Sequence, residues 1–398
     1  MSSSWTIPGI SGQSLDVAAP DTRAARARRP DVAPLLAKKP EWAPRVWHGC
    51  GILAWVALLR RNRFAVHPRY WYTAAIVTIV AVVNTMLGLL ERAIYGRAVR
   101  KTTIRQAPIF LIGHWRTGTT LLHELMICNE HFGFPTTYQC IQPHHFLLTE
   151  RLFSRWFRFL VPATRPMDNM RAALDRPQED EFAMCMLGTV SPYSAMAFPN
   201  HSAGRNDLLD LETMGSVRRW KRRFHRFLQR VTFESGKRLV LKSPPHTARV
   251  KVLNEMFPGA IFVHIVRNPF EVFPSTVNLW RTLYWTQGLQ TPTFAGLEEM
   301  VLNTYARMHE KLEEAKKTLA KDRYYELTYE NLVKDPIGEI EKIYRYFQLP
   351  GFEAGLPRLE KYVAGLKSYE TNKYDLSAEQ RTLIAQRWGD VIERYGYR

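Results

Sequence analysis

Short apolar runs alternate with amphipathic stretches over the last three quarters of the chain. The run at residues 108–112 ends at Gly113, and similar runs follow at 238–242, 260–266 and 323–327. Stretches with apolar positions three and four residues apart lie between and after these runs, at 119–128, 246–257, 269–280, 297–319 and 337–347. Short apolar strands that alternate with helices predict a parallel sheet covered by helices on both faces.

The first hundred residues follow a different pattern. Residues 1–46 are rich in Pro, Ala, Arg and Ser without periodicity, which is typical of a mobile tail. Residues 47–100 are largely apolar, and 71–90 form a run of twenty residues without a charge, long enough to cross a membrane. Aromatic and arginine residues flank this run and favour contact with a membrane, whereas a buried helix of a large domain is the alternative.

Positive charge lies on both sides of the uncharged run, so charge alone does not orient a single span. Arginines at both ends are expected when both ends stay on the cytoplasmic face. We therefore expect residues 47–92 to associate with the membrane as a hairpin or an interfacial helix. The alternative is one span at 71–90, with the rest of the chain across the membrane.

The amino-acid composition limits the classes of partner that the protein is expected to bind. The chain has 55 Lys and Arg against 37 Asp and Glu, a net charge of +18, which favours anionic partners such as nucleic acid, an anionic membrane or a polyphosphorylated small molecule. The basic residues are spread along the chain without a zinc-finger spacing or a compact basic tract, so nucleic acid is not expected. The four cysteines show no C-x-x-C pairing and are expected to be reduced, as in the cytosol.

The strongest local motif is the sequence GHWRTGTT from Gly113 to Thr120, which follows a predicted strand and opens a predicted helix. Backbone N–H groups of such a loop, together with the helix N-terminus, form a concave anion site. The glycine spacing is that of a Walker A loop, but Thr119 stands where that loop has its lysine, and the positive charge is on Arg116 instead. A glycine turn without a ligand is the alternative.

Two further motifs stand at strand ends. Lys242 ends the apolar run 238–242, and Arg267 follows the run 260–266, with Ser275 about two turns into the next helix. Asn268 and Pro269 suit the cap and the first turn of that helix. Taken alone, the motif at Lys242 is also explained by a solvated lysine, and the motif at Arg267 by a surface arginine. Because the carboxyl ends of parallel strands open on one edge of a sheet, all three motifs are expected to meet there.

Together, these motifs resemble those of the sulfotransferase family. Arg116 to Thr120 is similar to the loop that binds the 5′-phosphosulfate group, and Arg267 with Ser275 resembles the motif for the 3′-phosphate. Lys242 matches the strand-end lysine that contacts the transferring sulfuryl group. Residues 329–336, YENLVKDP, resemble an element of the branch that includes tyrosylprotein sulfotransferases and bacterial sulfotransferases. The resemblance covers about 104–351.

The resemblance implies a P-loop-like α/β fold with a central parallel sheet flanked by helices. It implies a sulfotransferase domain at 104–398. Within this domain, residues of about 140–235 are rich in Phe, Met, Trp and Arg, and we expect them to form an insertion that covers the acceptor side. The donor would be 3′-phosphoadenosine 5′-phosphosulfate, used without a metal. The donor-binding residues implied are Arg116, Thr117, Gly118, Thr119, Thr120, Arg267 and Ser275. Arg116 would also neutralise the leaving oxygen, and Lys242 would stabilise the sulfuryl oxygens.

The acceptor is expected to carry a hydroxyl group, and the membrane-associating segment beside an aromatic, basic insertion favours a small-molecule, lipid-like alcohol. The catalytic domain is expected in the cytoplasm, at the membrane surface. Residues 367–369 and 372–374 are candidates to close over the nucleotide. Two other functions remain open from the residues alone: a P-loop phosphotransferase that uses ATP, and a non-catalytic nucleotide-binding membrane protein.

The sequence does not identify the catalytic base directly. The histidine of cytosolic sulfotransferases would fall at Pro244, and the glutamate of tyrosylprotein sulfotransferases would fall near Thr136 or Thr137. The remaining candidates are carboxylates of the acidic run 179–181 and nearby histidines, ranked Glu181 and Asp180 first, then His246, then the pair His144 and His145. A solvated helix start is the alternative explanation of the acidic run.

Overall fold

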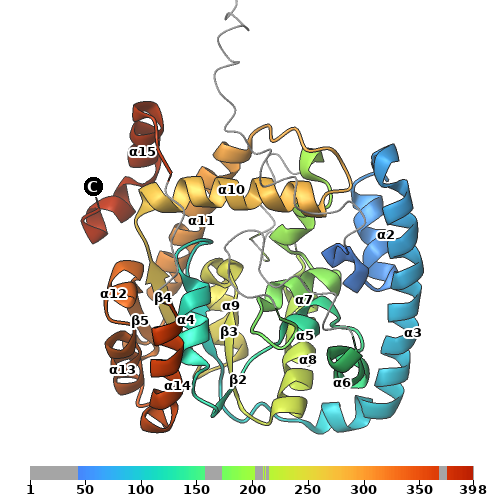
Figure 1. Ribbon diagram of the computed structural model, residues 1–398, viewed down its shortest axis with the longest axis horizontal. Helices are drawn as coiled ribbons and strands as arrows, with labels where there is room; N and C mark the ends of the chain where they lie inside the picture. Colours follow the sequence, from blue (N-terminus) through green and yellow to red (C-terminus); the bar gives the residue numbers. More distant parts are fainter. Residues whose placement is uncertain are drawn as a thin grey trace, which may run out of the picture. The chain divides into compact units, whose positions relative to one another are not determined.

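A five-stranded parallel sheet lies at the centre of the fold, with the order β2-β3-β1-β4-β5 (Figure 1). Its strands are β1 (Ile109–Ile112), β2 (Phe132–Gly133), β3 (Arg238–Lys242), β4 (Ile261–Val266) and β5 (Tyr324–Thr328). Every residue of β1 and β4 is buried, as is every residue of β3 except Arg238. The predicted class, a parallel sheet with apolar strands covered on both faces, is confirmed.

The structure is a computed structural model, and it describes residues 44–156, 173–201, 209, 211, 215–366 and 374–397, with the backbone alone at 152–156. Most of the expected tail at 1–46 lies outside these ranges. Of the residues expected to close over the nucleotide, 367–369, 372 and 373 also lie outside them, and only Tyr374 is described.

Alternate side chains of the strands supply two separate cores. Phe110, Ile112 and Leu241 pack with helices on one face, and Leu111 and Val263 pack with helices on the other. The first face is covered by α8 (Val217–Ser235), α9 (Val250–Met256) and α11 (Leu297–Lys316). The second is covered by α4 (Thr119–Met126), α12 (Tyr329–Lys334), α13 (Pro336–Tyr346) and α14 (Phe352–Gly365). This alternation follows from the two-residue period of a strand.

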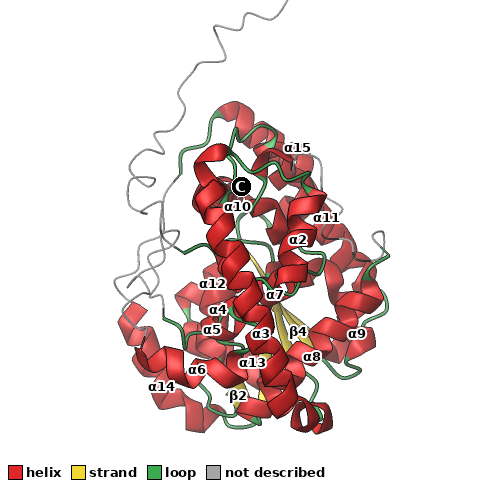
Figure 2. Ribbon diagram, turned by 90° about the vertical axis from the view of Figure 1, so that its right-hand side faces the viewer, coloured by secondary structure: helices red, strands yellow, loops and turns green. Residues whose placement is uncertain are grey.

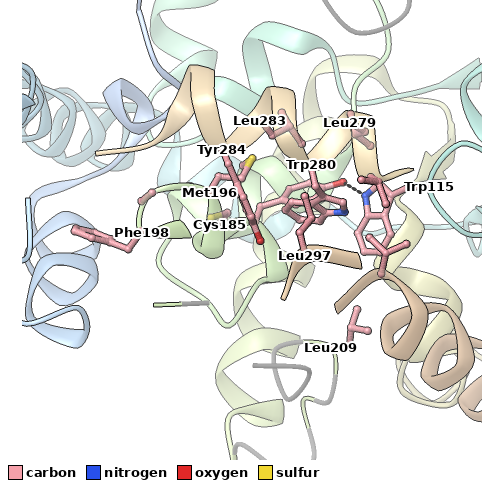
Figure 3. Close-up of a cluster of buried hydrophobic side chains, with 14 of the residues drawn as sticks. Trp115, Cys185, Met196, Phe198, Leu209, Leu279, Trp280, Leu283, Tyr284 and Leu297 are labelled. Atoms are coloured by element: carbon pink, nitrogen blue, oxygen red, sulfur yellow. Dashed lines mark hydrogen bonds between the residues drawn. The ribbon is translucent and has the colours of Figure 1, made fainter. Parts of the chain in front are cut away.

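A third apolar cluster lies beyond the sheet, around α10 (Pro269–Gln287) and α15 (Ala378–Tyr395). It includes Trp115, Trp280 and Tyr284, which Figure 3 shows packed together. The same cluster continues to Trp47 and Val77 of the N-terminal helices.

Some element boundaries differ from those expected. The stretch 246–257 is split into a 3-10 segment, η8 (Pro244–Arg249), and the helix α9. Two consecutive prolines open η8, and since proline has no N–H to donate, this start favours a tight turn over a regular helix. The helix after Asn268 runs to Gln287, past the expected end at 280. The sequence patterns did not indicate β2, α8, α14 or α15.

The described part of the expected insertion is helical and irregular. Helix α5 (Thr137–Ile141) begins just before the insertion. The other elements of the insertion are α6 (Phe146–Trp156), α7 (Asp180–Met186), η5 (Pro192–Met196), η6 (Pro199–His201) and α8. Helix α7 packs against α5, α8 and η5. The insertion thus brings the acidic run at the start of α7 next to the sheet.

The apolar segment at 47–100 forms η2 (Val46–Gly49), α2 (Ile52–Arg61), η3 (Pro68–Tyr70) and α3 (Trp71–Lys101). Helices α2 and α3 pack side by side along one edge of the fold, which Figure 2 turns toward the viewer. Among helices in the described ranges, Pro68–Lys101 is the one long and apolar enough to cross a membrane, and only 22% of its most apolar stretch is buried. It is therefore not a core helix, which was the alternative interpretation.

Candidate active site

The glycine loop connects β1 to α4 and requires both of its glycines. Gly113 has a φ of +151°, and a Cβ there would lie 2.6 Å from the carbonyl oxygen of Ile265. Gly118 has a φ of +98°, and a Cβ there would lie 2.4 Å from the ring of Tyr329. Arg116 adopts a φ of +70°, an uncommon conformation for a residue with a side chain. The loop is therefore held in one tight conformation against β4 and α12.

The sheet brings the three predicted motifs to one edge. Strand β1 lies between β3 and β4 and is parallel to both, with Leu111 paired to Lys242 and Ile112 paired to His264. Lys242 therefore ends its strand beside the start of the glycine loop, and Arg267 leaves β4 at the same edge. The loop and both cations are neighbours because the strands between them are in register.

The two arginines are connected to each other. Arg116 Nε donates a hydrogen bond to Ser275 Oγ at 2.9 Å, and Arg267 Nη1 donates to the carbonyl oxygen of Arg116 at 3.3 Å. The Arg267 guanidinium also lies 4.2 Å from the ring centre of Tyr329 and forms an ion pair with Glu271. The residues expected to bind the 5′- and 3′-phosphates thus form one cationic group on the loop and α10.

The three threonines of the loop have different positions. Thr117 is buried, and its hydroxyl donates to the carbonyl oxygen of His114 at 2.8 Å, which closes the loop on itself. Thr119 is also buried and opens α4. Thr120 is half-buried, and its Oγ1 lies 3.3 Å from Lys242 Nζ. Thr120 is therefore the loop threonine that faces the strand-end lysine.

Lys242 is buried, and it is paired with Glu179. Its Nζ donates to Glu179 Oε1 at 2.8 Å, and the side chain of Lys242 is only 2% exposed. Tyr193 donates its hydroxyl proton to the other carboxylate oxygen of Glu179 and accepts a hydrogen bond from Trp115 Nε1 at 2.9 Å. Hydrogen bonds therefore run from Trp115 of the glycine loop through Tyr193 to Glu179. From Glu179 they continue through Lys242 to Thr120 of the same loop.

The hydroxyl of Tyr193 stays protonated in this chain. Burial raises the pKa of Tyr193 well above its ordinary value, and the nearby negative charge of Glu179 raises it further. Tyr193 therefore acts as a hydrogen-bond donor to Glu179, and the carboxylate is the one acceptor between a phenol and an ammonium group.

The other two carboxylates of the acidic run point into the core. Glu181 forms an ion pair with Arg249 at 2.5 Å, and Asp180 Oδ1 lies 2.8 Å from His246 Nε2. All four side chains are at most 1% exposed. The two carboxylates lie against buried partners in η8, whereas Glu179 contacts Lys242 directly. The ranking of Glu181, Asp180 and His246 as bases stays a prediction, and Glu179 is the member of the acidic run that lies at Lys242.

Local geometry explains why the neighbours of Glu179 differ from it. Glu179 is the N-cap of α7, with extended backbone angles, and Asp180 begins the helix. Successive helical residues point about 100° apart, so adjacent carboxylates at a helix start face different surroundings. The sequence named the acidic run, but nothing in the pattern indicated which of its three members faces Lys242.

The histidine pair ranked last does not contact Lys242. His145 contacts Thr149 and Asn84, at 2.8 and 3.1 Å, and His144 lies 3.3 Å from the carbonyl oxygen of Met186. Burial lowers the pKa of both histidines to about 4, which keeps them neutral near pH 7. Within the described ranges, no group of three or more His, Cys, Asp or Glu side chains is arranged to hold a metal ion.

A glycine loop, a strand-end lysine and an arginine–serine pair on one edge of a parallel sheet define a class of group-transfer enzymes. The profile of the sulfotransferase family matches residues 108–354, which include all of these features. The chain belongs to the sulfotransferase family and is a sulfotransferase. Of the functions left open by the sequence, sulfuryl transfer is thereby favoured over phosphotransfer from ATP and over a non-catalytic role.

Particular relatives can also be named. The chain is 48% identical over 359 residues to the omega-hydroxy-beta-dihydromenaquinone-9 sulfotransferase Stf3 of Mycobacterium bovis and to that of Mycobacterium tuberculosis. Each match covers 90% of this chain and 92% of the relative.

Solved structures show the same fold at lower identity. Sulfotransferase STF9 from Mycobacterium avium matches with a TM-score of 0.61 and 17% identity, over 87% of this chain and 96% of that one. Sulfotransferase STF1 from Mycobacterium tuberculosis matches with a TM-score of 0.56 and 18% identity, over 86% and 88% of the two chains.

A structural role of the Glu181–Arg249 pair can be tested by its effect on stability. Replacing Arg249 by Met leaves the Glu181 carboxylate buried without its partner, which should lower the free energy of unfolding by about 3–5 kcal/mol. Chemical unfolding of the purified protein measures this loss. The double variant Glu181→Met with Arg249→Met should recover most of it, because both charges are then removed.

The matched control is Arg345→Met, which breaks an exposed pair with Glu341. It should change the free energy of unfolding by less than about 1 kcal/mol. Equal losses for Arg249→Met and Arg345→Met would show that the Glu181–Arg249 pair is not structural.

Proposed function

We propose that this sulfotransferase moves a sulfuryl group from 3′-phosphoadenosine 5′-phosphosulfate to the hydroxyl group of a lipid-like alcohol, with Glu179 as the catalytic base. The observation that carries the proposal is the contact between Lys242 and Glu179 beside the glycine loop. A buried ammonium group and a carboxylate stand there at the point where the group to be transferred would meet its acceptor.

The residues at the sheet edge fit an anionic donor. Arg116 and the backbone N–H groups of residues 118–120 would hold the 5′-phosphate, since a helix N-terminus preceded by glycine favours anions. Arg267 and Ser275 would hold the 3′-phosphate. The link between Arg116 and Ser275 supports this arrangement, because it places both phosphate sites within one connected group.

The donor supplies an activated sulfuryl group, and the protein positions it and moves one proton. The acceptor oxygen forms a bond to sulfur while the bond from sulfur to the 5′-phosphate oxygen breaks, and 3′-phosphoadenosine 5′-phosphate leaves. Lys242 stabilises negative charge on the sulfuryl oxygens, and Arg116 neutralises the leaving oxygen. Glu179 takes the proton of the acceptor hydroxyl. As in phosphoryl transfer, positioning and charge stabilisation carry most of the catalysis.

A lipid-like acceptor is supported by two observations. The relatives of 48% identity are named for sulfation of a hydroxylated menaquinone derivative. In addition, the apolar cluster that contains Trp115 and Tyr193, beside Glu179, continues without a break to Val77 and Ala81 of α3. An alcohol with a long apolar part therefore suits the surroundings of the proposed base.

The proposed location is a membrane surface, with the catalytic domain in the cytoplasm. The exposed apolar residues of 47–92 support membrane association. All four cysteines are free, and three of them are buried, which suits a reducing compartment.

The first prediction concerns donor recognition. Wild-type protein should bind 3′-phosphoadenosine 5′-phosphate more tightly than ADP, and Arg267→Ala should remove most of the difference. A hydrogen bond to a charged group contributes about 1.5–3 kcal/mol, so the difference should be at least tenfold in affinity. Isothermal titration calorimetry measures both ligands. Equal wild-type affinities would contradict the assignment of the 3′-phosphate site.

The second prediction concerns Lys242. Lys242→Ala should lower kcat far more than it weakens binding of 3′-phosphoadenosine 5′-phosphate, because the lysine interacts with charge on the group in transfer. Steady-state kinetics and calorimetry on the same preparation separate the two effects. A collapse of nucleotide affinity with normal turnover would make Lys242 a binding residue only.

The third prediction concerns the base. Glu179→Gln keeps the size of the side chain but cannot take a proton. Its single carbonyl oxygen can replace only one of the two carboxylate oxygens that accept from Lys242 and Tyr193. The substitution should lower kcat by about 10²–10⁴-fold, with little change in nucleotide affinity. The matched control is Glu310→Gln, on an exposed face of α11. Normal turnover in Glu179→Gln would eliminate Glu179 as the base.

A further inference from the structure

The N-terminal helices carry a set of exposed apolar side chains, called here the apolar plate. The residues of the plate are Leu53 and Val56 of α2 and Ile76, Ile79, Val82, Val83, Met86, Leu89, Leu90 and Ile94 of α3. Each is between 40% and 84% exposed. We propose that the plate lies flat within one leaflet of an anionic membrane and that α3 does not cross it.

The helix α3 has two distinct faces. Its buried positions follow a helical spacing along one side: Thr73, Val77, Ala81, Asn84, Glu91 and Val99. The apolar plate occupies the other side. The outward face of a helix on a soluble protein is usually polar. The outward face of α3 is apolar instead, which is unfavourable in water and suits a lipid surface.

The polar side chains of α3 are bonded to the rest of the protein. Asn84 Nδ2 donates to the carbonyl oxygens of His48 and Cys50, at 2.7 and 3.0 Å. Glu91 forms an ion pair with Arg230 of α8 at 2.5 Å. Because the folded domain satisfies these groups, the helix cannot turn its polar side elsewhere without breaking them.

This docking argues against a span. The buried positions from Thr73 to Val99 cover about 39 Å at 1.5 Å per residue, more than the thickness of a bilayer core. If α3 crossed the membrane, α8 would enter the hydrocarbon with it, because α8 is held to α3 through Glu91 and Arg230. Helix α8 carries exposed arginines at 218, 219, 222 and 226, which are strongly disfavoured there.

The charged residues around the apolar plate favour an anionic membrane as its partner. From 44 to 101 the sequence contains a single acidic residue, Glu91, and it is buried. Exposed basic residues flank the plate at both ends: Arg60, Arg61, Arg63, Arg69, Arg92, Arg97, Arg100 and Lys101. An apolar surface with a basic rim fits a leaflet with anionic headgroups better than it fits a second copy of the same basic chain.

The placement has a consequence for the acceptor, which rests on the proposed function. The apolar cluster beneath the plate contains Val77 and Ala81 and extends to Trp115 and Tyr193 beside Glu179. A lipid-like alcohol dissolved in the same leaflet would approach the base along this apolar side, without its apolar part entering water.

Binding to vesicles tests the plate. The full chain is sedimented with vesicles of phosphatidylcholine alone or mixed with phosphatidylglycerol, and the mixed vesicles should bind more protein. The variant Ile79→Glu with Met86→Glu should lower the partition coefficient about tenfold or more, because two embedded apolar side chains become charged. The matched control Val333→Glu changes an exposed apolar residue on α12 and should bind like the wild type.

Labelling distinguishes a flat helix from a span. Single cysteines at Arg63→Cys, in the connection before α3, and at Arg97→Cys, in its last turns, mark the two sides of the apolar stretch. Each is made in a Cys128→Ser background, and the other three cysteines are buried. A membrane-impermeant maleimide added outside the vesicles should label both positions. Protection of one position until detergent is added would show a span and overturn the proposal.

Two further measurements complete the test. Sedimentation velocity without lipid would detect a dimer that the double variant dissociates; such a dimer, without vesicle binding, would make the plate an interface between copies. Sulfation of a short, water-soluble alcohol should survive Ile79→Glu with Met86→Glu, whereas sulfation of a vesicle-bound alcohol should fall. Vesicle binding without sulfation of any alcohol would refute the proposed function and leave the plate in place.

Discussion

The parallel packing of β3, β1 and β4 is the constraint on which the candidate site depends. Each strand is too short and too apolar to hold a charged group in its interior, so Lys242 and Arg267 stand at or just beyond a strand end. The register aligns these ends, and the tight loop from Gly113 to Gly118 fits between them because neither glycine has a side chain. Cations that are far apart in the sequence are thus concentrated at one edge, where each favours an anionic ligand.

Two buried contacts orient the carboxylate that meets this edge. The pair Glu181–Arg249 and the close approach of Asp180 to His246 anchor the start of α7 to η8, directly after β3. The backbone N–H of Glu181 also donates to Ser243 Oγ at 3.1 Å, next to Lys242. Because these contacts use the two following carboxylates, Glu179 is left to face the lysine. Buried ion pairs are costly to form, and here their consequence is the orientation of Glu179 toward Lys242.

The N-terminal helices contribute to the apolar surroundings of the site. The buried polar residues Asn84 and Glu91 of α3 are bonded to the rest of the protein, and the apolar groups of the helices are divided between the shared core and the outer face. The core that supports Trp115 and Tyr193 is therefore continuous with the helices that face away from the protein. Anion chemistry on one side of Glu179 and an apolar environment on the other suit a reaction between a charged nucleotide and an apolar alcohol.

Local patterns in the sequence determined the elements and the anion chemistry. Apolar runs predicted four of the five strands. The glycine spacing predicted the loop from Gly113 to Thr120, and Lys242 and Arg267 were predicted from their places at the ends of apolar runs. The two-residue β2 carries too little periodicity to be recognised, and the uncharged run at 71–90 had the same composition whether the helix crossed a membrane or lay on a domain.

Only the tertiary structure decided which neighbours each side chain has. Glu179, Asp180 and Glu181 are equivalent in the sequence, and their roles separate because the turn into α7 directs one toward Lys242 and two toward buried partners. The faces of α3 were likewise decided by long-range contacts of Asn84 and Glu91 with residues tens to more than a hundred positions away. Hydrophobic pattern and loop chemistry are local properties, whereas the pairing of buried charges depends on how distant segments pack.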